Sequence, residues 1–375
     1  SMLMRGTTKR TRQQITDDLD KLKARVGVGG GPNSVTVTIE STRQNLPAVL
    51  EIIGEVLRSP SFPQNELDQL KQQQLAGIEN MKSEPQGIVP RAFMRHLSPY
   101  PKGDVRYTPT FEEEIADIQA VTVDEMRKFH TGFYGVAKAE MVIIGDFDPE
   151  QAQTLTNKLF GGWKSPQAYV RVRSPYRKIA PVNESFQTPD KANAFFMAGQ
   201  TIQIRDDHPD YAAMVLANYI IGGSGLNSRL FGRIRGKEGL SYGVGSQFQV
   251  QPEEDNAVFL AYAISAPENT LKVEASLKDE LAKILKEGFT GEEVTAAKKS
   301  WEQQQNVSRA QDRELATRLA GWTYYGRTMA WDADLERKVQ SLTAAQLVEA
   351  LRRHLDLNAI TIMKGGDFKK AGVAP

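Results

Sequence analysis

An internal duplication is the feature of this 375-residue sequence that most constrains its fold. Several short segments of the first half recur, in the same order, in the second half. The matching sets are Phe62, Glu66 and Lys71 with Phe289, Glu293 and Lys298, then Val121-Thr122 with Leu342-Thr343, then Gly145-Asp146-Phe147 with Gly366-Asp367-Phe368. Such an ordered set of matches predicts two diverged copies of one folded unit of about 200 residues.

Each copy is predicted to combine strands with helices, because both periodicities are present. Residues 34–40 alternate between apolar and polar side chains, as a half-buried strand does. Residues 46–57 carry apolar side chains at helical spacing. The predicted fold class is α+β: two homologous α/β-sandwich lobes, each with a mostly antiparallel sheet and helices packed on one face.

The other elements are predicted from the same patterns. Further helices are expected at residues 10–24, 66–81, 122–133, 209–221, 268–287, 291–325 and 344–354. Further strands are expected at residues 140–144, 193–198, 243–250, 257–264 and 359–363. The glycines between residues 27 and 31 are interpreted as a break, and residues 85–112 as a proline-rich irregular segment.

The duplication and the order of the predicted elements indicate three regions. These are a first lobe over residues 1–160, a linker over 161–184 and a second lobe over 185–375. The linker combines Gly161-Gly162 with three prolines among basic residues. The N-terminal Ser1-Met2 resembles an expression scar, and no signal-peptide pattern follows it, so the first lobe is expected to be N-terminally truncated.

Composition excludes several classes of function. The net charge of +1 gives no global sign of a nucleic-acid partner, and the basic cluster at residues 5–12 is expected to be a solvated face. No apolar run is long enough to predict membrane insertion. The absence of cysteine excludes disulfides, a thiol nucleophile and cysteine-ligated zinc.

Familiar hydrolase motifs are absent from the sequence. The four histidines lie far apart, and no pair has the spacing that places two imidazoles on one helix face. They are expected to be surface or capping residues, with a zinc site built from distant ligands left open. The tripeptide Gly223-Ser224-Gly225 has neither the pattern of a nucleophile elbow nor that of a phosphate-binding loop.

The candidate functional segment is the stretch at residues 222–243. Glycine permits close backbone approach, while guanidinium and phenol groups hold carbonyl oxygens and oxyanions. The candidate residues are Gly222, Gly223 and Gly225 in a loop, followed by Arg235 and Tyr242. The structural alternative is that the arginine pairs with an acid, the tyrosine covers the core and the glycines form a plain connection.

At these residues the chain resembles the pitrilysin/insulinase family of zinc metallopeptidases. The matching residues are Ser228-Arg229-Leu230-Phe231-x-x-Ile234-Arg235-x-Lys237-Glu238-Gly239-Leu240-Ser241-Tyr242, a segment that is similar to the family's Arg/Tyr motif. The resemblance extends over nearly the whole chain, through residues 4–10, Phe62-Pro63-x-x-Glu66, the helix after Thr122 and Gly145-Asp146-Phe147. A duplicated α+β lobe is also the family's structural unit.

The resemblance implies a chain that binds no zinc itself. The family's inverted motif, His-x-x-Glu-His, would precede Gly6-Thr7 and is not present. The position of the family's glutamate ligand is occupied by Gly77 and that of a supporting acid by Leu70, while Glu79 is out of register. Zinc is therefore expected only in a complementary half, fused to this chain or separate from it.

In the family, two halves close around a peptide chamber. By resemblance, Tyr242 would bind the oxyanion or the scissile carbonyl, Arg235 would hold substrate carbonyls, and the glycine loop would lie close to the chamber. The expected function is that of the inactive half, with no peptidase activity alone. The alternatives are a non-catalytic structural or peptide-binding module, and an independent hydrolase with an unrecognised site. The expected partners are a zinc-bearing half and a peptide, and localisation stays open, although bacterial family members are often exported.

Overall fold

The computed structural model describes residues 2–374, and the chain divides into two compact units. Unit 1 comprises Ser1–Ile78, Phe111–Val172 and Arg309–Gly326. Unit 2 comprises Glu79–Thr110, Arg173–Ser308 and Arg327–Pro375. Residues 163–182, within the expected linker, contain no helix or strand. Two segments depart from the expected lobes, because residues 79–110 belong to unit 2 and residues 309–326 to unit 1.

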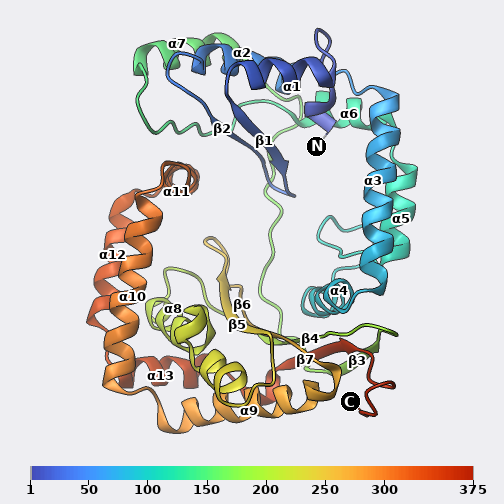
Figure 1. Cartoon of the computed structure of the whole chain (residues 1–375). Helices are drawn as coiled ribbons and strands as arrows, with labels where there is room; N and C mark the ends of the chain where they lie inside the picture. Colours follow the sequence, from blue (N-terminus) through green and yellow to red (C-terminus); the bar gives the residue numbers. More distant parts are fainter. Residues whose placement is uncertain (1, 375) are drawn as a thin grey trace. The chain divides into compact units, whose positions relative to one another are not determined.

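Unit 1 is mainly helical and has a two-stranded antiparallel sheet (Figure 1). Its strands are β1 (Arg25–Gly30) and β2 (Val35–Glu40). Its helices are α1 (Arg12–Lys21), α2 (Leu46–Arg58), α3 (Gln64–Ser83, which continues into unit 2), α5 (Phe111–Ala120), α6 (Val123–Phe133), α7 (Pro149–Phe160) and α11 (Asp312–Tyr324), with a 3-10 turn at Met2–Arg5.

The core of unit 1 forms where the apolar stripe of α2 meets α1. Val49, Ile53 and Val56 of α2 are buried, and so are Ile15 and Leu19 of α1. Helix α1 begins at a capping box, in which the side chains of Thr11 and Gln14 each accept a hydrogen bond from the other residue's backbone amide. The amphipathic pattern at residues 46–57 therefore correctly predicted both a helix and its buried face.

Unit 2 is built around a five-stranded sheet with the order β3-β7-β4-β6-β5. The strands are β3 (Asn183–Gln187), β4 (Ala194–Ile202), β5 (Gly243–Val250), β6 (Ala257–Ser265) and β7 (Thr361–Gly366). Only β3 and β7 pair in parallel, and every other pairing in this sheet is antiparallel. The helices are α4 (Pro85–Leu97), α8 (Tyr211–Asn218), α9 (Thr270–Glu287), α10 (Gly291–Arg309), α12 (Met329–Ser341) and α13 (Ala344–His354).

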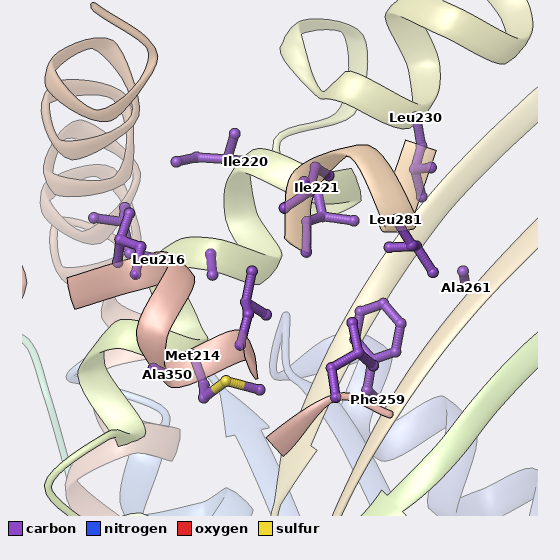
Figure 2. Packing of buried hydrophobic residues seen from close by; sticks show 14 of the residues in the cluster. Met214, Leu216, Ile220, Ile221, Leu230, Phe259, Ala261, Leu281 and Ala350 are labelled. Atoms are coloured by element: carbon purple, nitrogen blue, oxygen red, sulfur yellow. The ribbon is translucent and has the colours of Figure 1, made fainter. Parts of the chain in front are cut away.

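Alternate residues of the sheet enter two different cores. Phe196 and Ala198 of β4 pack with the large cluster that contains residues of α8, α9 and α13. Figure 2 shows Met214 and Leu216 of α8 and Phe259 of β6 among the buried side chains of this cluster. Because side chains alternate across a strand, Met197 of β4 enters a second, smaller cluster instead.

That second cluster is formed by α4, a helix that the sequence pattern did not predict. Val89 and Phe93 of α4 are fully buried against this face of the sheet. The prolines between residues 85 and 112 led to the prediction of an irregular segment, but Pro85 stands in the first helical turn, where proline is tolerated. Helix α4 therefore covers the sheet face opposite α8, α9 and α13, which explains why its segment belongs to unit 2.

The predicted repeat is visible in matching hydrogen bonds. Thr122 and Glu125 form a capping box at the start of α6, as Thr343 and Gln346 do at the start of α13. Two further pairs of bonds correspond: Lys71 Nζ to Gln119 O with Lys298 Nζ to Gln340 O, and Arg5 to Glu66 with Arg229 to Glu293. The bonds of each pair join equivalent positions of the two copies, which supports the duplication inferred from sequence.

Other local predictions are corrected. Residues 140–144 form no strand, since the sheet of unit 1 consists of β1 and β2 alone among the described residues. The glycines at 27–30 lie in β1, where pairing with β2 overrides their weak strand preference. The expected helix at 291–325 is two helices, α10 and α11, and α12 was not predicted. In the basic cluster, Arg5 is buried and bound to Glu66 rather than solvated.

Replacement of Phe93 by alanine tests the packing of α4 on the sheet. Removing a fully buried ring is expected to lower the free energy of unfolding of unit 2 by about 3–5 kcal/mol. Urea denaturation measures this loss, and Met94→Ala, on the exposed side of the same helix, is the control. Equal effects of the two changes would contradict the buried interface.

Candidate functional site: the Arg235 and Tyr242 segment

Two buried side chains hold the candidate segment in place, and part of that segment is a π-helical turn. Leu230 and Ile234 are both fully buried in the main core of unit 2, and Leu230 is labelled in Figure 2. They anchor η4 (Phe231–Lys237), the π-helical turn that carries Arg235. Such turns are rare and are found frequently at functional sites.

The chain then turns sharply into strand β5. Gly239 has φ +64, a left-handed conformation that disfavours other residues. The amide of Leu240 donates to the carbonyl of Ile234 at 2.9 Å, which closes the turn. The amide of Tyr242 donates to Ile264 O of β6 at 2.8 Å. The backbone is thus fixed on both sides of Arg235 and at Tyr242.

Two neighbouring arginines are tied into the protein by acidic partners. Arg229 donates to both carboxylate oxygens of Glu293, at 2.7 and 2.8 Å. Arg233 donates to Glu238 and Asp279, at 3.0 and 2.5 Å. The hydrogen bond from Arg229 holds the pKa of Glu293 below its usual value of 4.5. These two side chains stabilise the fold around the segment.

Unlike Arg229 and Arg233, the side chains of Arg235 and Tyr242 have no hydrogen-bonding or ionic partner among the described residues. Arg235 is exposed, lies 5.1 Å from the centroid of the Phe231 ring, and forms no side-chain hydrogen bond or ion pair within residues 2–374. Tyr242 is 62% exposed, and its hydroxyl also lacks a hydrogen-bond partner in this described part of the chain. The alternative that the arginine pairs with an acid and the tyrosine covers the core therefore does not describe this structure.

The three glycines that were expected to form a loop lie instead in two short helical turns, Gly222 and Gly223 in the π-helical turn η2 (Tyr219–Gly223) and Gly225 in the 3-10 turn η3 (Gly225–Asn227), and their environments differ. Gly222 is buried, and a Cβ added there would lie 2.4 Å from the amide nitrogen of Ser246 in β5. This glycine is thus required for close packing within unit 2. Gly223 lies near Asn218, whereas Gly225 has φ +62 and a Cβ added to it would meet nothing within 4 Å. Contact of this loop with a substrate stays a prediction.

The expected zinc-ligand positions lie on α3. Leu70 packs partly buried against the core of unit 1, and Gly77 has open space around it. Glu79 lies 3.6 Å from Lys82 of the same helix in an exposed pair. A leucine and a glycine offer no ligand atom, so these positions do not fit the family's zinc site.

Tertiary structure brings together two of the histidines that the sequence separates. The ring centroids of His208 and His354 lie 5.2 Å apart, and Asp210 lies beside both. The other two histidines each donate to a backbone carbonyl, His96 to Ala180 and His130 to Leu57. The sequence analysis left a site built from distant ligands open, but the separation of His208 and His354 in sequence gave no signal that these two would meet.

A methyl group at position 222 tests the packing of the glycine loop. Gly222→Ala is expected to destabilise unit 2 by about 1–3 kcal/mol, because the new Cβ would overlap the β5 backbone. Gly232→Ala, where a Cβ meets nothing within 4 Å, is the matched control and is expected to be neutral or stabilising. Urea midpoints give both values, and a neutral Gly222→Ala would refute the close approach.

The pair Arg229–Glu293 predicts a pH-dependent contribution to stability. Because the folded-state pKa of Glu293 is lowered, its stabilisation is present above pH 4.5 and is lost as pH falls through the folded-state pKa. The stability difference between wild type and Arg229→Met should thus shrink between about pH 7 and about pH 3. Arg235→Met, which removes an unpaired arginine, serves as the control. A constant difference for Arg229→Met would disprove the linkage.

Two family models match the chain. The model of the Peptidase M16 inactive domain matches residues 120–300, and that of the Insulinase family (Peptidase family M16) matches residues 1–100. The non-peptidase homolog YmxG of Helicobacter pylori is 21% identical, covering 98% of this chain and 83% of the homolog. An uncharacterized zinc protease of Rickettsia bellii is 26% identical, covering 97% of this chain and 85% of the protease.

Solved structures agree on the fold. A crystal structure of a peptidase M16 inactive domain from Pseudomonas fluorescens has a TM-score of 0.84 at 24% identity, covering 97% of this chain and 86% of that one. The periplasmic protease PqqL of Escherichia coli has a TM-score of 0.76 at 14% identity, and this chain covers 39% of it. In the described residues no helix is both long and apolar enough to cross a membrane. The α+β fold is confirmed, and the chain belongs to peptidase family M16, the pitrilysin/insulinase family, as a homologue of its inactive domain.

Proposed function

We propose that this chain is the inactive half of a pitrilysin/insulinase-type zinc peptidase, and that it supplies Arg235 and Tyr242 to a peptide held at a zinc-bearing half. The observation that carries the proposal is the contrast among neighbouring side chains. Arg229 and Arg233 are bound by acids, whereas Arg235 and Tyr242 are exposed without such partners in the described chain. The exposed guanidinium and phenol, on a backbone that is fixed, are therefore available to bind a substrate.

The chemistry of the two groups suits peptide hydrolysis. The Tyr242 hydroxyl donates one hydrogen bond, which would stabilise the negative charge that develops on the scissile carbonyl oxygen. The Arg235 guanidinium presents several donors in a planar fork and would hold substrate backbone carbonyls. Loss of one oxyanion donor typically costs about 3 kcal/mol of transition-state stabilisation. The backbone bonds at Ile234 and Ile264 keep the cost of reorganisation low.

No part of the family's catalytic zinc site is assigned to this chain, because Leu70 and Gly77 do not fit the family's ligand positions. The chain is expected to cleave nothing alone. Its partner would be a protein or fused half that carries the His-x-x-Glu-His motif. Gly223 and Gly225 would lie at the edge of the peptide site, whereas Gly222 has its packing role.

Complementation of peptidase activity tests the proposal. Hydrolysis of a quenched fluorescent peptide is measured with the chain alone and with an M16 protein of the same organism that carries the zinc motif. Activity is expected only in the mixture, and Tyr242→Phe should lower kcat/KM by about tenfold or more. Arg235→Lys should act mainly on KM, because it weakens substrate binding while the charge is kept.

The control is Lys237→Gln, which changes another exposed cation of the same turn. It is expected to leave kcat/KM unchanged. Chelator-sensitive cleavage by the chain alone would refute the inactive-half assignment. If the mixture is active and Tyr242→Phe leaves its kcat/KM unchanged, the chain is better described as a structural or peptide-binding module. The similarity to a non-peptidase homolog also supports that alternative.

A further inference from the structure

We propose that His208, Asp210 and His354 form a binding site for one divalent transition-metal ion of the zinc class. One ring nitrogen of each histidine and one carboxylate oxygen of Asp210 all lie within 4.8 Å of one another. All three residues belong to unit 2. The site shares no residue with the Arg235 and Tyr242 segment, and the proposal does not depend on the peptidase role. It also departs from the sequence-based expectation that this chain binds no metal.

The carboxylate of Asp210 is directed toward the other candidate ligands. Asp210 immediately precedes α8, but its side chain makes no capping bond to that helix. It accepts a hydrogen bond from His354 Nε2 at 2.8 Å. An aspartate at this position normally caps its own helix, so its direction toward α13 brings a ligand oxygen to the imidazole.

Both histidines are held in place by backbone contacts. His354 is the last residue of α13, and its carbonyl accepts a hydrogen bond from Gln200 Nε2 of β4 at 2.7 Å. His208 Nδ1 accepts from the amide of Asp210 at 3.1 Å, which limits rotation of the ring. The two rings meet edge to face, with their centroids 5.2 Å apart. Little backbone movement is therefore needed to bring the three ligands together.

Two imidazoles and one carboxylate are a ligand set that suits zinc, nickel, copper and iron. Zinc binds nitrogen and oxygen at about 2.0–2.2 Å, which places the ligands of one ion about 3–4 Å from each other. The observed separations require only rotamer adjustments. All three residues are half-buried, so solvent can supply the remaining coordination position.

A competing contact sets the expected strength of binding. Arg353 donates to both oxygens of Asp210, through Nε at 2.9 Å and Nη2 at 2.7 Å. A metal ion must share or displace this arginine, and His208 must give up its hydrogen bond if it binds through Nδ1. Binding is therefore expected to be weaker than at a site whose ligands have no competing cation. The ion would join the start of α8 to the end of α13.

Calorimetric titration of the EDTA-stripped full chain with zinc chloride and nickel chloride tests the site. One saturable equivalent is expected, with a rise of several degrees in the melting temperature at excess metal. His208→Ala and His354→Ala should each weaken binding by at least the roughly tenfold that loss of a partner outside the first ligand shell typically costs. His96→Ala, which changes a half-buried histidine of the same unit, should leave the affinity for metal unchanged. Circular dichroism confirms that each variant is folded.

Arg353→Gln separates a three-ligand site from adventitious histidine binding. It frees the Asp210 carboxylate and should tighten zinc binding by several-fold, whereas a site without Asp210 would not respond. Cobalt chloride gives a second readout, since a low-coordinate cobalt site absorbs strongly in the visible range. Absence of saturable binding, retention of binding in both histidine variants, or an unchanged affinity in Arg353→Gln would overturn the proposal.

Discussion

The burial of Leu230 and Ile234 in the core of unit 2 is the interaction on which the candidate site depends. Both side chains are fully enclosed, and together they fix the π-helical turn from which Arg235 projects. The same core is continuous with the face of the sheet in which β5 and β6 pair, and that pairing fixes Tyr242. Two exposed polar groups are therefore held by apolar packing rather than by bonds of their own.

The need to cover both faces of the five-stranded sheet explains why residues from both halves of the chain belong to unit 2. A sheet with apolar side chains on both faces needs a helical layer on each side. Helices α8, α9 and α13 provide one layer, and α4 provides the other from a distant part of the sequence. Unit 2 therefore includes residues 79–110, which belong to the first copy of the repeat. The bounds of the units consequently differ from those of the repeats.

Much of the fold followed from sequence, for identifiable reasons. The helix at 46–57 was predicted because its apolar residues keep a helical period, the strand at 243–250 because its residues alternate, and the strand at 257–264 because it is a short apolar run. The prediction failed at α4, where prolines mask a helix, and at residues 140–144, where an apolar run finds no neighbouring strand. Arg235 and Tyr242 were selected by their pattern, but their lack of partners could not be inferred from it.

Residue types at fixed local spacing were enough to predict the duplicated α+β architecture and the family. Only the tertiary structure shows that acidic side chains bind Arg229 and Arg233, and that Arg235 has no such partner among the described residues. It also brought His208 and Asp210 beside His354, more than a third of the chain away. Ion pairs and ligand clusters join residues from distant helices, so their partners are fixed only when the core positions those helices.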